Sequence, residues 1–351
     1  MLIRKIFHVA ALATSAAMAV SLISACGGTG ASGSDGATVT VYSADGLATW
    51  YDGVFKKFTD ETGISVNLVQ AGSGEVVSRV EKEQSNTQAD LMVTLPPFIQ
   101  KADKSGLLVA SGQDTADIPA EQIGPEGRYV PILNNALCFI ANPGADPQPV
   151  TWDDLLNPAF KGKLQYSTPG QAGDGTAALV LLQHLRGKQG ALDYLAQLQI
   201  NNVGPSSSTG KLLPKVSNGE LLVANGDVQV DLGAIKSNRA NVNIFFPADS
   251  DGKRTTVAVP ALAGVVKGAP HQDEAKKLLA FMLSDKIQQT VATEALAIPV
   301  REHVRVSTST SAGPNTPAAV LEGVEVWVPD WNAVVSDLET DLAAYQRATG
   351  S

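Results

Sequence analysis

Short strand-like runs alternate with amphipathic helical segments along this chain, and this alternation restricts the possible fold more than any other feature. Residues 38–42 and 64–69 are rich in Val, Thr and Ile, which favours strands. Apolar residues recur at helical spacing over 47–58 and 75–84. A further buried strand is expected at 90–94. This βαβαβ order predicts an α/β fold, with helices on the faces of a parallel sheet and a ligand site at the carboxyl ends of its strands.

The same alternation resumes in the second half of the chain. A helix is expected at 98–104 and a Ser/Thr/Pro-rich loop at 307–316. Further strands are predicted at 163–166, 221–225, 242–246 and 256–266, and further helices at 176–185, 191–198, 271–283, 284–295 and 331–345. The folded part, residues 37–351, is long enough for two domains or lobes.

The N-terminus has the pattern of an export signal. Arg4 and Lys5 form a short positive region, and residues 8–23 are an uncharged run of apolar and small side chains. The hexapeptide LISACG at 22–27 has the form of a bacterial lipobox, with an aliphatic residue three places before a cysteine. The alternatives are an uncleaved membrane anchor, or an ordinary signal with a cysteine there by chance.

The lipobox predicts how the mature chain begins. Residues 1–25 are expected to be removed as a signal peptide, and Cys26 is expected to carry a lipid. Residues 26–36 are rich in Gly and Ser, as in a flexible linker. The protein is therefore expected outside the cytoplasm, attached to the cell membrane through the lipid on Cys26 alone. No other run of about eighteen apolar residues follows in the sequence.

Charge and cysteine content exclude several classes of function. The formal net charge is −9, and removal of the signal leaves about −11. An acidic chain of this kind is not expected to bind nucleic acid or anionic membrane surfaces, although a cleft can still bind a small anion. After lipidation of Cys26, Cys138 is the remaining thiol, and its apolar surroundings predict a core position. A disulfide within the monomer is then impossible.

Four polar segments follow strands or precede helices. They are 42–46, 94–97, 167–176, and the pair formed by 206–210 with 225–227. The segments 167–176 and 206–210 combine glycines and hydroxyl groups with an expected helix start. Free N–H groups and the positive end of the helix dipole at such a start suit an oxyanion. The alternative is that these segments are capping loops and nothing more.

These segments carry a resemblance to a known family. Residues 40–47, 89–100, 167–176, 201–211 and 223–227 are similar to the 2-aminoethylphosphonate-binding proteins of phosphonate ABC importers. The resemblance implies the bilobal type II periplasmic-binding fold shared with ferric-ion-binding proteins, two Rossmann-like lobes joined by crossing hinge strands. It implies one lobe from 37–134 with 258–305 and another from 135–257 with 306–351. The crossings are expected at 133–140 and 256–265.

The sequence departs from the ferric relatives at their metal ligands. Leu95 stands where those proteins have an acidic residue, and no tyrosine pair follows residues 218–220. A hard trivalent cation needs several anionic oxygen donors, so no metal site is expected. The resemblance further implies that the synergistic phosphate site of the ferric proteins has been kept here for a phosphonate.

The resemblance and the polar segments together give a set of candidate ligand-binding residues. The phosphonate is expected near Thr168, Gly175, Thr176, Ser208 and Asn225. The ammonium of the ligand is expected at Asp45 or Asp227, with help from Tyr42 or Ser43. Alternatively, Asp45 and Asp174 are helix N-caps. The full set is Tyr42, Ser43, Ala44, Asp45, Thr94, Ser167, Thr168, Gly175, Thr176, Ser208, Thr209, Asn225 and Asp227.

The sequence thus predicts a monomeric solute-binding protein that captures 2-aminoethylphosphonate between two lobes and delivers it to an ABC permease. It is expected to need no cofactor and to catalyse no reaction. Ferric ion, phosphate or a polyamine-like cation are alternative ligands of the same fold. An extracellular phosphoester hydrolase is the alternative from another class, but neither a nucleophile motif nor histidines at metal-ligand spacing are found.

Overall fold

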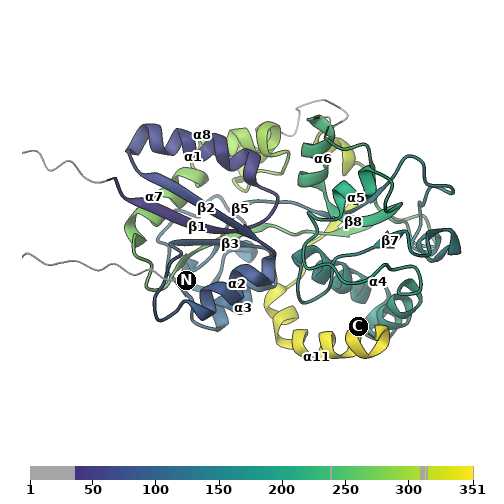
Figure 1. Cartoon of the computed structure of the whole chain (residues 1–351). Coiled ribbons are helices and arrows are strands. Elements are labelled where there is room, and N and C mark those ends of the chain that lie inside the picture. The colour runs from purple at the N-terminus through teal and green to yellow at the C-terminus, as the bar shows by residue number, and fades with distance from the viewer. Residues whose placement is uncertain (1–35, 238, 309–312, 314, 351) are drawn as a thin grey trace, which may run out of the picture. The chain divides into compact units, whose positions relative to one another are not determined.

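A six-stranded sheet forms the first half of the fold (Figure 1). The computed structural model describes residues 36–237, 239–308, 313 and 315–350, so the expected signal, the lipobox with Cys26 and most of the linker lie outside the described residues. The strand order is β2-β1-β3-β11-β4, and β5 also pairs with β11. These strands are β1 (Thr38–Ala44), β2 (Ser65–Ala71), β3 (Leu91–Thr94), β4 (Leu108–Val109), β5 (Val130–Leu133) and β11 (Ala261–Val266).

The expected parallel arrangement holds for the first three strands. β1 runs parallel to β2 and β3, whereas β11 runs antiparallel to β3, β4 and β5. Helices α1 (Ala48–Thr62), α7 (Gln272–Leu283) and α8 (Asp285–Thr290) share one apolar core with the sheet. Helices α2 (Ser73–Lys82) and α3 (Phe98–Lys104) form a second core on the other face.

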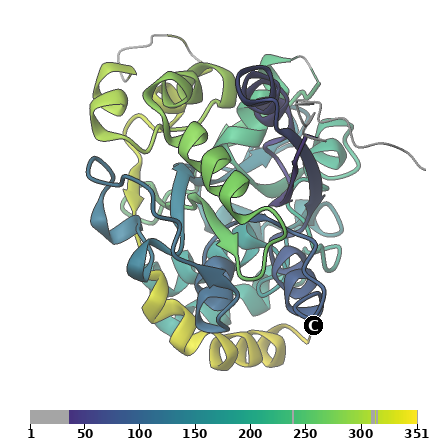
Figure 2. The ribbon, with the colours of Figure 1, turned by 90° about the vertical axis from the view of Figure 1, so that its left-hand side faces the viewer.

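The second sheet has four strands, in the order β7-β8-β6-β9. They are β6 (Leu137–Ala141), β7 (Leu164–Gln165), β8 (Val223–Asp227) and β9 (Asn243–Phe245). α4 (Gly173–Leu198) and α11 (Trp331–Thr349) share an apolar core with this sheet, and α5 (Leu213–Ser217) and α6 (Val228–Lys236) pack nearby. α11, yellow in Figure 2, also lies against α3 of the first half. Cys138 on β6 is buried, which confirms its core position.

The smaller elements complete the chain. β10 (Thr255–Val257) pairs with β12 (Glu325–Trp327), a π-helical turn spans Val291–Ala295, and α9 (Glu302–Thr308) and α10 (Pro317–Val320) follow. Short 3-10 helices lie at Ala120–Gln122, Pro125–Gly127, Asp153–Leu156 and Pro158–Phe160. Across the described residues, none of the helices combines the length and the apolar character needed to cross a membrane.

Two connections join the first sheet to the rest of the fold, one to β6 of the second sheet and one to β10, which pairs with β12 in a separate two-stranded sheet. Residues 134–136 join β5 to β6, and residues 258–260 join β10 to β11. The two connections touch each other, because Ala136 and Ala258 form an antiparallel bridge. Both connections fall inside the crossings expected from the sequence.

Several expected elements were wrong in detail. The strand expected at 256–266 is interrupted around Pro260, which has no N–H group to donate to a ladder. By contrast, the two helices expected at 176–185 and 191–198 are present, separated within α4 by a break at Gly187, whose φ of 70° is not helical. The segment 206–210 does not open a helix, because α5 begins at Leu213 after a turn.

Candidate functional site

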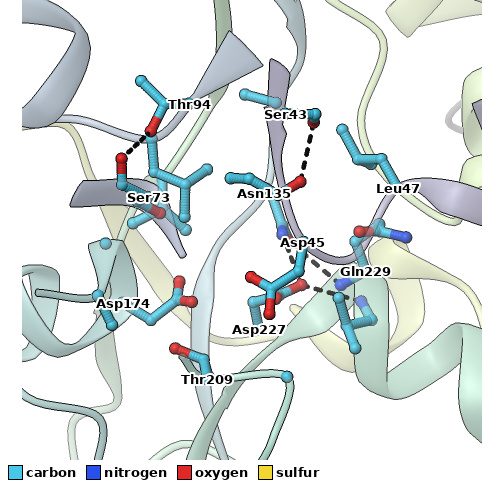
Figure 3. A pocket seen from close by; sticks show the side chains of 18 of the residues that line it. Ser43, Asp45, Leu47, Ser73, Thr94, Asn135, Asp174, Thr209, Asp227 and Gln229 are labelled. Carbon is cyan, nitrogen blue, oxygen red and sulfur yellow. Dashed lines mark hydrogen bonds between the residues drawn. The ribbon is translucent and has the colours of Figure 1, made fainter. Parts of the chain in front are cut away.

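A small cavity lies where the ends of β1 and β3 meet the starts of α2, α4 and α6 (Figure 3). Its volume is about 30 Å³, room for about two water molecules, so a larger solute must separate its walls. Both sheets and the connecting segments contribute to it. The polar lining residues are Ser43, Asp45, Ser73, Thr94, Asn135, Asp174, Ser208, Thr209, Asp227 and Gln229.

The first half of the chain provides mainly hydroxyl groups. The Ser43 hydroxyl lies 2.8 Å from the Ala44 carbonyl, to which it donates, and 3.1 Å from the Tyr51 hydroxyl. The Thr94 hydroxyl donates to the Ser73 carbonyl at 3.0 Å. Ser73 is also the first residue of α2. These contacts fix a row of short polar side chains at the carboxyl edge of the first sheet.

Two of the three helix starts at the cavity, those of α2 and α4, have no side-chain cap. α2 begins at Ser73 and α4 begins at Gly173, and both residues line the cavity. The first N–H groups of a helix have no acceptor within the helix, and the dipole places partial positive charge there. The cavity therefore offers an anion binding capacity that does not depend on Lys or Arg.

Three carboxyl groups face the same cavity. Asp45 accepts a short hydrogen bond from the Ser208 hydroxyl. Asp227 accepts from the Asn135 amide at 2.7 Å and from the Val230 N–H at 2.9 Å, which makes it the N-cap of α6. Asp174 is 3% exposed, and its Oδ1 atom has no hydrogen-bond partner among the described residues. One acceptor is thus buried at the cavity without a donor.

The close carboxyl groups disfavour one another's negative charge. Burial, followed by the charge of Asp227, raises the pKa of Asp174 well above its usual range, while the Thr209 hydroxyl opposes this shift. Burial also raises the pKa of Asp227, against the hydrogen bonds from Val230 and Asn135. No Lys or Arg is found among the described residues that line the cavity. A cation entering it would stabilise the ionised form of these carboxyl groups.

This arrangement predicts a pH dependence for the protein without solute. The pKa of Asp174 is higher in the folded protein than in the unfolded chain, where it is near 4. The protonated Asp174 carboxyl group therefore contributes to stability below about pH 4, and this contribution is lost as pH rises through the folded-state pKa. Asp174→Asn should remove that loss. Thermal unfolding of both proteins from pH 4 to pH 8 should show the variant gaining stability relative to the parent as pH rises. A difference that does not change with pH would contradict the prediction.

The structure brings about half of the expected ligand-binding residues to the cavity. Those that line it are Ser43, Ala44, Asp45, Thr94, Ser208, Thr209 and Asp227. Those that do not are Tyr42, Ser167, Thr168, Gly175, Thr176 and Asn225. Of the five residues expected at the phosphonate end, Ser208 alone lines this cavity.

Ser167 and Asn225 lie behind the cavity wall. Ser167 Oγ accepts from the Thr209 hydroxyl at 2.9 Å and from the Asn225 amide at 3.0 Å. The Ser167 N–H donates to Asn225 Oδ1 at 2.7 Å. Both side chains are fully buried and fix the loop that carries Thr209. They support the site without lining it.

The remaining expected residues have structural contacts of their own. Thr176 Oγ1 donates to the Ala172 carbonyl and accepts from the Gly170 N–H, and Thr168 Oγ1 accepts from the Ser206 N–H. The Tyr42 hydroxyl donates to Glu83 at 3.0 Å, and Arg79 lies over the Tyr42 ring. Tyr42 is thus held in the core between the first sheet and α2.

The interpretation of Asp45 and Asp174 as helix caps was wrong. The N-cap of α1 is Leu47 and that of α4 is Ala172, and neither makes a side-chain capping bond. Sequence reasoning also missed four lining residues, Ser73, Asn135, Asp174 and Gln229, as ligand candidates. The Gly-Asp-Gly sequence at 173–175 was the available signal for Asp174, because it puts a carboxyl group inside a polar segment that leads into an expected helix.

The three histidines in the described part of the chain have surface or capping roles. His271 is the N-cap of α7 and its ring lies 3.3 Å from Asp90, whereas His184 stacks on Trp327. His303 pairs with Asp117 and Asp285. Within the described ranges, no group of three or more His, Cys, Asp or Glu side chains is arranged to hold a metal ion.

Sequence comparisons relate this chain to known binding proteins. A family model described as bacterial extracellular solute-binding protein matches residues 39–294. A Salmonella typhimurium relative named "Putative 2-aminoethylphosphonate-binding periplasmic protein" is 44% identical over 319 residues, which cover 89% of this chain and 93% of the relative. The Fe(3+)-binding periplasmic protein of Serratia marcescens is 25% identical, over 82% of this chain and 85% of the relative.

Solved structures show the same fold. The periplasmic binding protein AfuA from Actinobacillus pleuropneumoniae, with fructose-6-phosphate bound, matches with a TM-score of 0.75 at 21% identity, over 90% of this chain and 99% of that chain. Iron-bound HitA from Pseudomonas aeruginosa matches with a TM-score of 0.69 at 22% identity, over 89% and 99%. The expected type II periplasmic-binding fold is confirmed.

Proposed function

Because this chain belongs to the bacterial extracellular solute-binding protein family, we propose that its solute is 2-aminoethylphosphonate. Proteins of this family bind a small molecule outside the cytoplasm and deliver it to a transporter permease, and they are not enzymes. The observation that carries the proposal is the cavity itself, where three carboxyl groups lie beside hydroxyl groups and two helix starts. A small zwitterion has the two opposite charges that such a cavity can bind.

The ammonium group of the solute would lie at the carboxyl groups. Asp174 Oδ1 lacks a donor in the described part of the chain, and among neighbouring charges that of Asp227 raises the pKa of Asp174 most. An ammonium has three N–H donors and a positive charge, so it would bond to Asp174 and stabilise both carboxylates at once. In this proposal Asp174 replaces Asp45 and Asp227 as the principal partner of the amine, since both of those already accept hydrogen bonds.

The phosphonate group would lie at the starts of α2 and α4. Ser73 and Gly173 begin these helices and line the cavity, as do Ser43 and Thr94. First-turn N–H groups bind phosphate-type oxygens well, because they are fixed donors at the positive end of a helix. The two carbon atoms between the amine and phosphonate would span the short gap to Asp174.

Capture would take place by closure of two lobes, 37–134 with 258–305 and 135–257 with 306–351. Three hydrogen bonds join these two parts around the cavity. Ser208 donates to Asp45, Gln229 Nε2 donates to the Gly46 carbonyl at 3.2 Å, and the Gly74 N–H donates to the Gln171 carbonyl at 3.1 Å. A solute that contacts both lobes would stabilise the closed state.

Titration calorimetry with a matched panel tests the proposal. 2-Aminoethylphosphonate should bind at least about tenfold more tightly than ethylphosphonate, which lacks the amine, or inorganic phosphate. Ferric citrate should give no stoichiometric binding, because Leu95 stands where the ferric proteins have a carboxylate. Equal affinity for all three phosphorus compounds, or tight ferric binding, would overturn the assignment.

The membrane attachment is part of the same proposal. Lipidation at Cys26 would keep the binding protein at the membrane surface beside its permease, and residues 26–36 would act as the tether. Cys26→Ala should move the protein from the membrane fraction to the soluble fraction without lowering its Tm, because the first strand begins only at Thr38. Detergent partitioning measures this, and a variant that stays in the detergent phase would contradict it.

A further inference from the structure

A larger cavity adjoins the solute cavity on the side of α1 and α6. Its volume is about 920 Å³, and it lies between α1 with the π-helical turn on one side and α5 with α6 on the other. Four residues, Asp45, Gly210, Gln229 and Val230, line both cavities. We call this space the outer cavity. Its shared wall makes it the space next to the solute site.

Two hydrogen bonds lie at the boundary between the outer cavity and the solute cavity. Ser208 donates to Asp45, and Gln229 Nε2 donates to the Gly46 carbonyl at 3.2 Å. Another cavity, beside α2 and α3, shares no lining residue with the solute cavity among the described residues. The geometry therefore favours the outer cavity as the route by which a solute approaches its site.

Three exposed cationic side chains line the outer cavity, all from the side of α5 and α6. They are Lys211, Lys236 and Arg239. Lys236 donates to the Thr293 carbonyl at 2.8 Å and Arg239 donates to the Ser237 hydroxyl at 2.7 Å, and both acceptors are uncharged. Within the described ranges, none of the three cations forms an ion pair with a carboxylate. Their positive charges are therefore available to an anion in the outer cavity.

The acidic side chains of the outer cavity do not cancel these charges. Glu294 lies 3.6 Å from Lys57, which balances its charge from outside the cavity lining. Asp45 lies at the inner boundary and accepts the hydrogen bond from Ser208. The outer cavity thus has an excess of positive charge, although the whole chain has a formal net charge of −9. A chain with this net charge repels anions in general, so a local positive region matters for an anionic solute.

We propose that the outer cavity is an encounter site that attracts the phosphonate group of the incoming solute, with Lys211 as its principal cation. Lys211 directly follows Gly210, which lines both cavities. Attraction between opposite charges acts over about a Debye length, roughly 8–10 Å at physiological salt, so the three cations act together without contacting the same oxygen atom. The inference rests on the proposed function, because the phosphonate is the group that the cations attract.

The test is a stopped-flow measurement of solute association with the full chain, followed by tryptophan fluorescence, since Trp50 lines the outer cavity. At low ionic strength, Lys211→Gln should lower the association rate constant of 2-aminoethylphosphonate by about threefold, the effect of one unit charge on a phosphonate roughly 10 Å away in water. The dissociation rate constant should stay the same, as is usual for a charge at the rim of a site. Ethylphosphonate should be slowed at least as much, because the cation attracts the phosphonate and not the amine.

Two further variants separate the local charge from structure and from total charge. Lys211→Arg keeps the positive charge and should associate at the parent rate. Lys161→Gln makes the same change in net charge at an exposed lysine that precedes β7, at the end of this strand away from Ser167 and the cavity wall. This control should leave the association rate constant nearly unchanged. In about 1 M salt, where the Debye length is about 3 Å, Lys211→Gln should associate as fast as the parent.

Three results would contradict the encounter site. An association rate that does not change in Lys211→Gln would remove its principal cation. Equal slowing in Lys211→Gln and Lys161→Gln would show that total charge, and not the outer cavity, sets the rate. Slowing that persists in about 1 M salt would show that Lys211 acts through structure. A parent protein that binds neither phosphonate would contradict the proposed function as well, so failure of this inference alone is distinguishable from failure of both.

Discussion

Replacing Asp174 with Asn will weaken 2-aminoethylphosphonate binding by about 30-fold or more, while ethylphosphonate affinity changes by less than about threefold. Removing one partner of a buried, hydrogen-bonded charge pair costs about 2–5 kcal/mol, which is the origin of the first figure. Ethylphosphonate has no amine, so it does not need the carboxylate. Calorimetry with both solutes measures the two effects on the same protein sample.

A matched variant on the same helix separates this effect from a general loss of structure. Asp193 is an exposed residue of α4 that accepts a hydrogen bond from Gln189. Asp193→Asn should leave both affinities unchanged. Equal losses of affinity for the two solutes in Asp174→Asn would mean that Asp174 does not bind the amine. Asp45 or Asp227 would then be the expected partner of the ammonium.

Replacing Gly175 with Ala will lower the stability of the folded protein by about 3 kcal/mol, since overpacking at a rigid site is costly. A methyl group at Gly175 would lie 2.1 Å from the Ser167 carbonyl oxygen and 2.5 Å from its carbon. These are backbone atoms, so α4 or the loop that leads into it must move. The Tm should fall by about 5 °C or more.

Gly233 provides the control for this substitution. It also lies inside a helix, α6, but an added methyl group there would have no atom within 4 Å. Gly233→Ala should therefore raise stability by about 0.5–1 kcal/mol, because alanine loses less backbone entropy in a helix. Scanning calorimetry of both variants decides the matter, and a Gly175→Ala protein with the parent Tm would show that the close approach at Ser167 is easily relieved.

The layered α/β fold was predictable because its signals are local. Alternating apolar runs such as Val39 and Val41 on β1 mark the strands, and Gly63 ends α1 in the left-handed conformation that glycine adopts at little cost. The break in the expected 256–266 strand was less evident, because a proline within an apolar run can also lie at the edge of a sheet.

The site was predictable only in part, because a sequence does not show which side of a loop faces a cavity. Ser167 and Thr209 both lie in polar segments, yet Thr209 lines the cavity and Ser167 lies behind it. For Asp174 a capping role was the alternative to a role in the ligand site, since capping is a common role of Asp at a helix start. Whether Asp174 Oδ1 has a hydrogen-bond partner depends on where Asp227 and Thr209 lie in the fold. The local sequence around Asp174 does not show those positions.

The Gly74 to Gln171 bond bears on how binding proteins of this fold acquire new solutes. It joins the two sides of the cavity through main-chain atoms, so it does not depend on which side chains line the cavity. Gly74 is also tightly placed, because a methyl group there would lie 2.9 Å from Phe98 and 3.0 Å from the Gln171 carbonyl. Substitutions at Ser43, Thr94 or Asp174 can therefore change the chemical preference of the cavity and leave this contact intact. Substitutions in the cavity lining alone can therefore adapt such a protein to a new nutrient, while the main-chain bond that joins the two sides of the cavity is kept.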